Sequence, residues 1–120
     1  MSEKLSAEEK IRHRAEYQRC YRKGRRRHGT YTTVHFVPNA LGHPRLGITA
    51  TRKVGCAVVR NRLKRRMREI YRRSIERRQL PSLDIVLHLK TTAKEASFEE
   101  LEKELLGLCR SLIKKAAPAP

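Results

Sequence analysis

The longest run of helical hydrophobic spacing in this chain lies within residues 57–77. Its apolar positions share one arc of a 3.6-residue wheel: Val59, Leu63, Met67, Ile70 and Tyr71. Asn61, Arg65, Arg68 and Arg72 lie opposite, while Arg62, Arg66 and Arg73 flank one edge. This pattern predicts a helix over residues 57–77 that docks on a sheet through its stripe and presents guanidinium groups outward.

Two further helices are predicted on either side of this one. Residues 12–23 form the first, ended by Gly24, and place Tyr17 and Tyr21 on one face because they are four residues apart. The last helix starts from a capping box of Ser97 and Glu100. Its apolar face carries Leu101, Leu105, Leu108 and Leu112.

Three segments have the composition of strands. Residues 30–37 alternate, with Val34 and Phe36 on one face and Tyr31, Thr33 and His35 on the other. Residues 45–52 place Leu46, Ile48 and Ala50 on one face of the sheet. Residues 84–90 follow a break at Pro81 and are apolar enough to form a central strand. The order α, β, β, α, β, α predicts a mixed α+β sandwich, and the loop 38–44 leaves the strand count open by one.

At 120 residues the chain has room for one domain, expected over residues 1–115. We expect residues 1–11 to be flexible and 116–120 to form a disordered tail. No stretch has the length of a membrane span or the apolar core of a signal peptide. Cys20, Cys56 and Cys109 form no CxxC pair, which favours reduced thiols, two of them in the core, in a cytoplasmic protein.

Charge changes the functional picture. The formal net charge is +17, and it lies in residues 12–27, with eight bases and one acid, and residues 52–78, with twelve bases and two acids. A charge of this size repels itself in the folded state, so it favours a polyanionic partner that neutralises it. Nucleic acid is the first candidate and an anionic membrane surface the second. A solvated helix face usually mixes both signs, so we interpret these segments as a binding surface.

Catalysis by the chain alone is not indicated. Between residues 17 and 94 the only acids are Glu69, Glu76 and Asp84, and the five histidines show no ligand spacing, so no metal site is expected. Arginine, which predominates in both basic segments, binds phosphate bidentately. Tyr17 and Tyr21 are candidates for stacking on single-stranded bases, although packing of the first helix on the sheet would also explain them.

The longest motif carries a family resemblance. "TRKVGCAVVRNRLKRRMRE", residues 51–69, with Arg60-Asn61-Arg62 followed by Lys64-Arg65, resembles the hallmark of the bacterial ribonuclease P protein subunit. "AEYQRCYRKGRR", "DIVLHLK" and "ASFEELEKEL" fit that family in order and spacing, so the resemblance covers residues 12–113.

The resemblance implies a two-layer α/β sandwich with a four-stranded mixed sheet and about three helices. It also implies a left-handed βαβ crossover, although almost all connections between parallel strands are right-handed. It implies an auxiliary subunit that binds the catalytic RNA and the 5′ leader of precursor tRNA and aids endonucleolytic removal of the leader. The protein alone would not be catalytic. It would bind no cofactor itself, and the ribonucleoprotein would require magnesium, held mainly by the RNA.

Site residues follow from the matched positions. The RNA-binding motif helix and preceding loop would use Arg52, Lys53, Arg60, Asn61, Arg62, Lys64, Arg65 and Arg68. A leader cleft between the first helix and the sheet would be lined by Tyr17, Tyr21, Thr33, His35, Thr49 and Thr51. Two positions depart from the family: Tyr stands where Phe is frequent in the aromatic pair, and Cys56 stands where a small polar residue is usual.

Two other classes would share the basic surface. A structural RNA-binding protein, such as a small ribosomal component, is the main rival, and a basic DNA-binding module is the other. Neither accounts for the long motif together with the aromatic pair.

Overall fold

The computed structural model describes residues 6–116. Three helices and four strands follow one another along the chain: α1 (Arg14–Lys23), β1 (Arg25–His28), β2 (Thr32–Pro38), β3 (Arg45–Ala50), α2 (Ala57–Arg73), β4 (Leu83–Leu89) and α3 (Phe98–Ala116). The strand order is β1-β2-β4-β3, antiparallel except for the parallel pair β3 and β4. The predicted four-stranded mixed sheet with three helices is therefore confirmed.

The central position of β4 follows from its composition. Leu83, Ile85, Val86, Leu87 and Leu89 are all buried, and β4 pairs with β2 on one side and β3 on the other. A strand covered on both faces needs such a continuous apolar run. The segment β3-α2-β4 is the expected βαβ unit; its left-handed sense stays an expectation from the resemblance.

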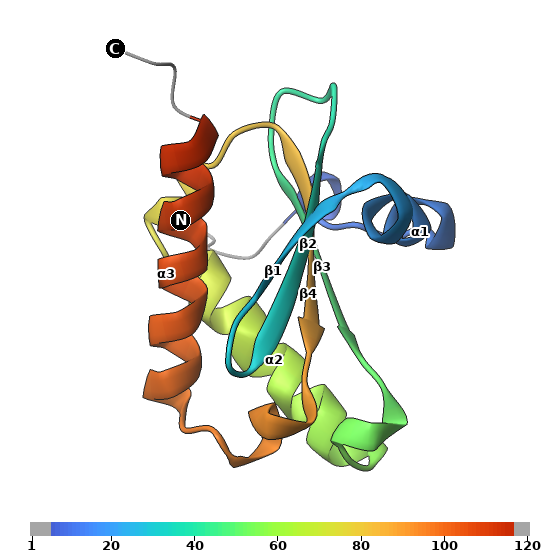
Figure 1. Cartoon of the computed structure of the whole chain (residues 1–120), viewed down its shortest axis with the longest axis vertical. Coiled ribbons are helices and arrows are strands. Elements are labelled where there is room, and N and C mark those ends of the chain that lie inside the picture. The colour runs from blue at the N-terminus through green and yellow to red at the C-terminus, as the bar shows by residue number, and fades with distance from the viewer. Residues whose placement is uncertain (1–5, 117–120) are drawn as a thin grey trace.

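Helices cover both faces of the sheet (Figure 1). The helices α2 and α3 lie against one face and form the main core with Val34, Phe36, Leu46 and Ile48. The helix α1 lies on the other face over a smaller cluster of Ile11, Cys20, Val37 and Val86, with Tyr17 packed against it. This arrangement leaves part of the α1 face of the sheet without a covering helix.

The arginine-rich helix α2 is shorter than predicted. The stripe is confirmed, because Leu63, Met67, Ile70 and Tyr71 are buried and Val59 packs beside them. However, the helix ends at Arg73 rather than residue 77, since the Ser74 amide and Ser74 hydroxyl both donate to the Tyr71 carbonyl. A short 3₁₀ turn, Glu76–Arg78, follows instead. A serine that competes for the backbone in this way ends a helix that hydrophobic spacing alone would extend.

The other helices begin as their capping residues specify. The Glu100 amide donates to Ser97 Oγ at 3.1 Å, and the Ser97 amide donates to Glu100 Oε1 at 3.0 Å, which confirms the predicted capping box of α3. The helix α1 starts at Arg14, two residues later than predicted, because the carboxylate of Glu16 accepts the amides of Arg12 and His13. It ends before Gly24, as expected.

The strand β1, with the sequence RRRH, was not located from the sequence. Three of its four residues are exposed and the other is half-buried, so it lacks the alternation of polar and apolar residues that marks a half-buried strand. It pairs with β2 at the edge of the sheet, with Arg26 opposite His35 and His28 opposite Thr33. Charged side chains are typical of such exposed edges.

Residues 6–11 belong to the segment that we expect to be flexible, which stays a prediction. Ile11 is buried, and its amide donates to the Leu46 carbonyl at 2.9 Å, so the segment lies along the outer edge of β3. The helix α3 continues to Ala116, and the rest of the predicted tail, 117–120, lies outside the described residues, as do residues 1–5. Cys20 and Cys109 are buried and Cys56 is exposed, and all three are free thiols, as predicted. None of the helices described is long and apolar enough to span a bilayer.

Candidate nucleic-acid interface

A row of polar side chains crosses all four strands on the face that α1 only partly covers. Strand pairing aligns His28 of β1 with Thr33 of β2, Thr33 with His88 of β4, and His88 with Thr49 of β3. The contacts agree with this register, since His28 Nδ1 lies 3.3 Å from Thr33 Oγ1 and His88 Nδ1 lies 2.9 Å from Thr49 Oγ1. We call these four residues the polar row.

Tyr21 extends from α1 over the polar row. Its hydroxyl shares a hydrogen bond with Thr49 Oγ1 at 2.8 Å. Its ring meets His35 edge to face, with centroids 4.6 Å apart, and lies 6.3 Å from the ring of His88. The side chain is nonetheless 40% exposed, so it is held at one end while an aromatic face remains open to a ligand.

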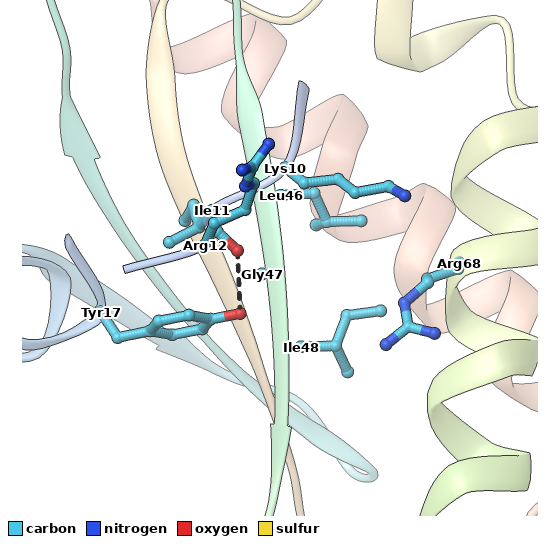
Figure 2. A pocket seen from close by; sticks show the side chains of 8 residues that line it. All are labelled: Lys10, Ile11, Arg12, Tyr17, Leu46, Gly47, Ile48 and Arg68. Carbon is cyan, nitrogen blue, oxygen red and sulfur yellow. Dashed lines mark hydrogen bonds between the residues drawn. The ribbon is translucent and has the colours of Figure 1, made fainter. Parts of the chain in front are cut away.

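Tyr17, one helical turn earlier, is more enclosed. Its ring lies against Gly47, where an added Cβ would come within 2.6 Å of the ring. Its hydroxyl donates to the Ile11 carbonyl at 3.3 Å (Figure 2). Burial raises the pKa of this phenol. The aromatic pair therefore divides its roles: Tyr17 packs α1 on the sheet, which was the alternative interpretation from the sequence, and Tyr21 is the more accessible ring.

The histidines beneath Tyr21 are disposed toward the neutral form. Burial lowers the pKa of His88, and burial together with the nearby His88, Arg26 and His28 lowers the pKa of His35. A neutral imidazole has one donor and one acceptor, so it can bond to base edges as well as to phosphate. The floor of this site is thus polar and largely uncharged near neutral pH.

A partly buried ion cluster centred on Asp84 fixes α1 above this face. Arg45 of β3 donates to both carboxylate oxygens of Asp84, at 2.8 and 2.7 Å, and to Glu16 of α1 at 2.6 Å. Arg19 of α1 lies 3.8 Å from Asp84, and Asn39 donates to it at 2.9 Å. Burial alone would raise the pKa of Asp84, but the bonds from Arg45 and Asn39 outweigh it and hold the pKa below its usual value. The cluster therefore joins α1 to both β3 and β4 through ionised groups.

The predicted motif residues form a cationic surface that begins where β3 ends. Arg52 and Lys53 are exposed in the 3₁₀ turn Arg52–Val54, and α2 follows. Asn61, Arg62, Arg65 and Arg68 are exposed, and Arg60 and Lys64 are half-buried. None of these eight residues forms an ion pair with a carboxylate within the part of the chain that the structure describes. Arg72 and Arg73, at the other end of α2, instead pair with Glu69 at 2.9 Å.

Cys56 is the N-cap residue of α2, at the start of this cationic surface. Its thiol is exposed, and it makes no side-chain capping bond. The backbone amide of Val59 in the first turn lowers the pKa of this thiol.

The structure brings most of the predicted leader-cleft residues together. Tyr21, His35, Thr33 and Thr49 meet on one face, Tyr17 lies beside them under α1, and Thr51 follows the end of β3. Sequence reasoning missed His28 and His88, which complete the polar row. His88 could have been found, because Asp84 and His88 are the two polar residues of the otherwise apolar strand β4. His28 gave no such signal, since β1 itself was not recognised.

Within residues 6–116, no group of three His, Cys, Asp or Glu side chains is placed to hold a metal ion. The interface consists instead of arginine and lysine cations, hydroxyls, imidazoles and one open aromatic face. These groups bind phosphate, stack on bases and bond to their edges.

Comparison with known proteins gives one consistent result. The family model described as Ribonuclease P matches residues 5–113. A "Ribonuclease P protein component" from Desulfovibrio desulfuricans is 43% identical, over 86% of this chain and 82% of its own length. The protein of that description from Syntrophomonas wolfei is 34% identical, over 88% of each chain.

Solved structures agree in fold. The RNase P protein from Thermotoga maritima has a TM-score of 0.77 and 32% identity, covering 86% of this chain and 96% of its own. The RNase P protein from Staphylococcus aureus has a TM-score of 0.76 and 28% identity, covering 90% and 94%.

Proposed function

Because the chain belongs to the ribonuclease P protein family, as the bacterial-type protein subunit of that endoribonuclease, we propose that it holds the 5′ leader of precursor tRNA beside the catalytic RNA. Partnership with the RNA subunit follows from the family. The leader contact is a proposal that rests on the geometry of the α1 face, and so is the assignment of individual residues.

In this proposal a single-stranded leader lies along the polar row. The open ring of Tyr21 stacks on one base, while His35, Thr33 and Thr49 bond to base edges or sugar hydroxyls. Flexible single strands are bound in this way because every base has a π-face and unpaired edges. Tyr17 contributes mainly by fixing α1 in place.

The cationic surface of α2 and its preceding turn binds RNA phosphates. Arg52, Lys53, Arg60, Asn61, Arg62, Lys64, Arg65 and Arg68 would contact the catalytic RNA or the leader. Arginine suits this task because its fork bonds phosphate bidentately. Magnesium ions for hydrolysis would be held mainly by the RNA, and the protein would reduce phosphate repulsion between catalyst and substrate.

The observation that carries the proposal is the position of β3. This strand lies at one edge of the sheet, with Tyr17 of α1 on one side and Arg68 of α2 on the other (Figure 2). The residue after it, Thr51, leads directly into the basic turn. A leader crossing the polar row would therefore reach the arginine-rich surface without leaving the protein.

Reconstitution at low magnesium tests the proposal. Adding the protein to its catalytic RNA should speed leader removal when magnesium is too low for the RNA alone, and the protein alone should cleave nothing. A structural RNA-binding protein of the ribosomal kind would bind RNA without this acceleration. Unchanged cleavage by the RNA on addition of the folded protein would therefore contradict the proposed function.

A further inference from the structure

A pocket of about 330 Å³ opens at the outer edge of β3, apart from the polar row. Figure 2 shows its position between the N-terminal segment, β3 and α2. It is lined by Lys10, Ile11, Arg12, Tyr17, Leu46, Gly47, Ile48 and Arg68. Its volume falls in the range of about 300–1,000 Å³ typical of small-molecule sites. The sequence assigned no role to Lys10, and Arg12 was placed only within the basic segment 12–27.

Three cations from two distant segments converge on this pocket. Lys10 and Arg12 come from the segment before α1, and Arg68 comes from the middle of α2. None of the three forms an ion pair among residues 6–116. The acids near them in sequence are engaged elsewhere. Glu9 accepts bonds from Ser6 and lies 3.5 Å from Arg77, and Glu69 pairs with Arg72 and Arg73. Glu16 is bonded to the amides of Arg12 and His13 and to Arg45. Their positive charge is therefore available to a ligand.

The floor of the pocket combines an aromatic ring with a bare stretch of backbone. Tyr17 lies on Gly47, and any side chain there would displace the ring. The backbone amide of Ile48 and the guanidinium of Arg68 both act to lower the pKa of Tyr17 against the larger effect of burial. The Tyr17 hydroxyl donates to the Ile11 carbonyl, at the edge of a strand whose outer side is covered only as far as Leu46.

We propose that this pocket binds a phosphodiester group of RNA, with the phosphate among Lys10, Arg12 and Arg68 and the attached nucleoside against Leu46, Gly47 and Ile48. The inference rests on the proposed function and extends it to a second site. Cations without carboxylate partners favour an anionic oxygen ligand, and arginine and lysine are the usual phosphate contacts.

Two parts of the complex could supply this phosphodiester. Gly47 precedes Thr49 by two residues, about 7 Å along a strand, so a leader stacked on Tyr21 could continue past Tyr17 into the pocket. Alternatively, a loop of the catalytic RNA bound by α2 could enter beside Arg68. The chemistry is the same, and leader length distinguishes the two.

The test compares Lys10→Ala/Arg12→Ala with Lys103→Ala/Lys114→Ala, which removes the same charge from exposed positions on α3. Holoenzymes are titrated with mature tRNA and with precursors whose leaders grow one nucleotide at a time. If the leader enters the pocket, the pocket variant should match the control on short leaders and bind long ones roughly tenfold more weakly. Its slope of log K against log salt should also fall by about 1.

If the catalytic RNA enters instead, the loss of affinity should be equal for every leader and should appear in protein–RNA assembly. Both results support the pocket, and Arg12→Lys should then retain most of the affinity. The proposed phosphodiester site would be overturned if the pocket variant bound RNA as tightly as the control variant. It would also be overturned if the loss of affinity appeared only together with a lower melting temperature. Equal binding of precursor and mature tRNA by the wild-type holoenzyme would instead contradict the proposed function itself.

Discussion

The hydroxyl groups of Tyr21 and Thr49 lie 2.8 Å apart and share a hydrogen bond. Thr49 is also within 2.9 Å of His88, so a helix side chain, an edge strand and the central strand are linked through three polar groups. This chain of contacts fixes one end of an otherwise exposed aromatic ring. A ring held before the ligand arrives loses less conformational entropy on binding.

Thr49→Val tests this positioning. The change keeps the shape of the side chain but removes the hydroxyl that Tyr21 and His88 share. We expect the holoenzyme to bind precursor tRNA roughly threefold to tenfold more weakly, the value of one ordinary hydrogen bond. Mature tRNA should bind as before. Thr49→Ser keeps the hydroxyl and should retain the affinity, whereas equal affinities for Thr49→Val and the wild type would mean that the bond does not position Tyr21.

Asp84→Asn tests the ion cluster that holds α1. The variant removes the negative charge and one of the two oxygens that accept from Arg45 at 2.8 and 2.7 Å, so Glu16 is the one carboxylate left bonded to Arg45. Removing one partner of a buried pair costs about 3 kcal/mol of unfolding free energy. Urea denaturation measures this loss, and Glu102→Gln, an exposed carboxylate of α3, is the matched control. A loss no larger than that of the control would show that the cluster contributes little.

The same cluster predicts how stability depends on pH. The folded-state pKa values of Asp84 and Glu16 are both lowered, so folding favours the ionised forms. Their contribution is present above the unfolded values, about 4, and is lost as pH falls through the lower folded values. Unfolding free energy should therefore decrease in that acid range, and it should decrease less steeply in Asp84→Asn. Parallel pH profiles would contradict this origin.

The cationic surface predicts strong salt dependence. Seven cationic motif residues with no carboxylate partner in the described chain should release several counterions on binding RNA, so log K should fall linearly and steeply with log salt. Replacing Arg62 and Arg65 by Ala should reduce the slope by about 1 for each phosphate that these side chains neutralise. A wild-type slope near one released ion would contradict the assignment of this surface to RNA.

The strongly periodic parts of the fold could be predicted from the sequence. The stripe of α2, the apolar β4 and the Ser97–Glu100 box each follow from local patterning that the tertiary structure does not override. The end of α2 could not be predicted in this way, because a bond from Ser74 to Tyr71 decides it. The strand β1 was missed because pairing with β2, not its own composition, makes it a strand.

The candidate site could likewise be predicted only in part. Helical spacing placed Tyr17 and Tyr21 on one face, but only the tertiary contacts distinguish the ring packed on Gly47 from the ring above the polar row. His88, Lys10 and Arg12 become site residues through strand register and chain proximity. Neither property can be read from spacing along the chain.

Affinity measured side by side for precursor and mature tRNA, with wild-type and Tyr21→Ala holoenzymes, tests the central claim most directly. Stacking contributes about 1–3 kcal/mol per base, so Tyr21→Ala should bind precursor roughly tenfold more weakly and mature tRNA unchanged. The melting temperature should stay near that of the wild type, whereas Tyr17→Ala should lower it. Equal losses of affinity for both substrates in Tyr21→Ala would contradict a leader contact on this face.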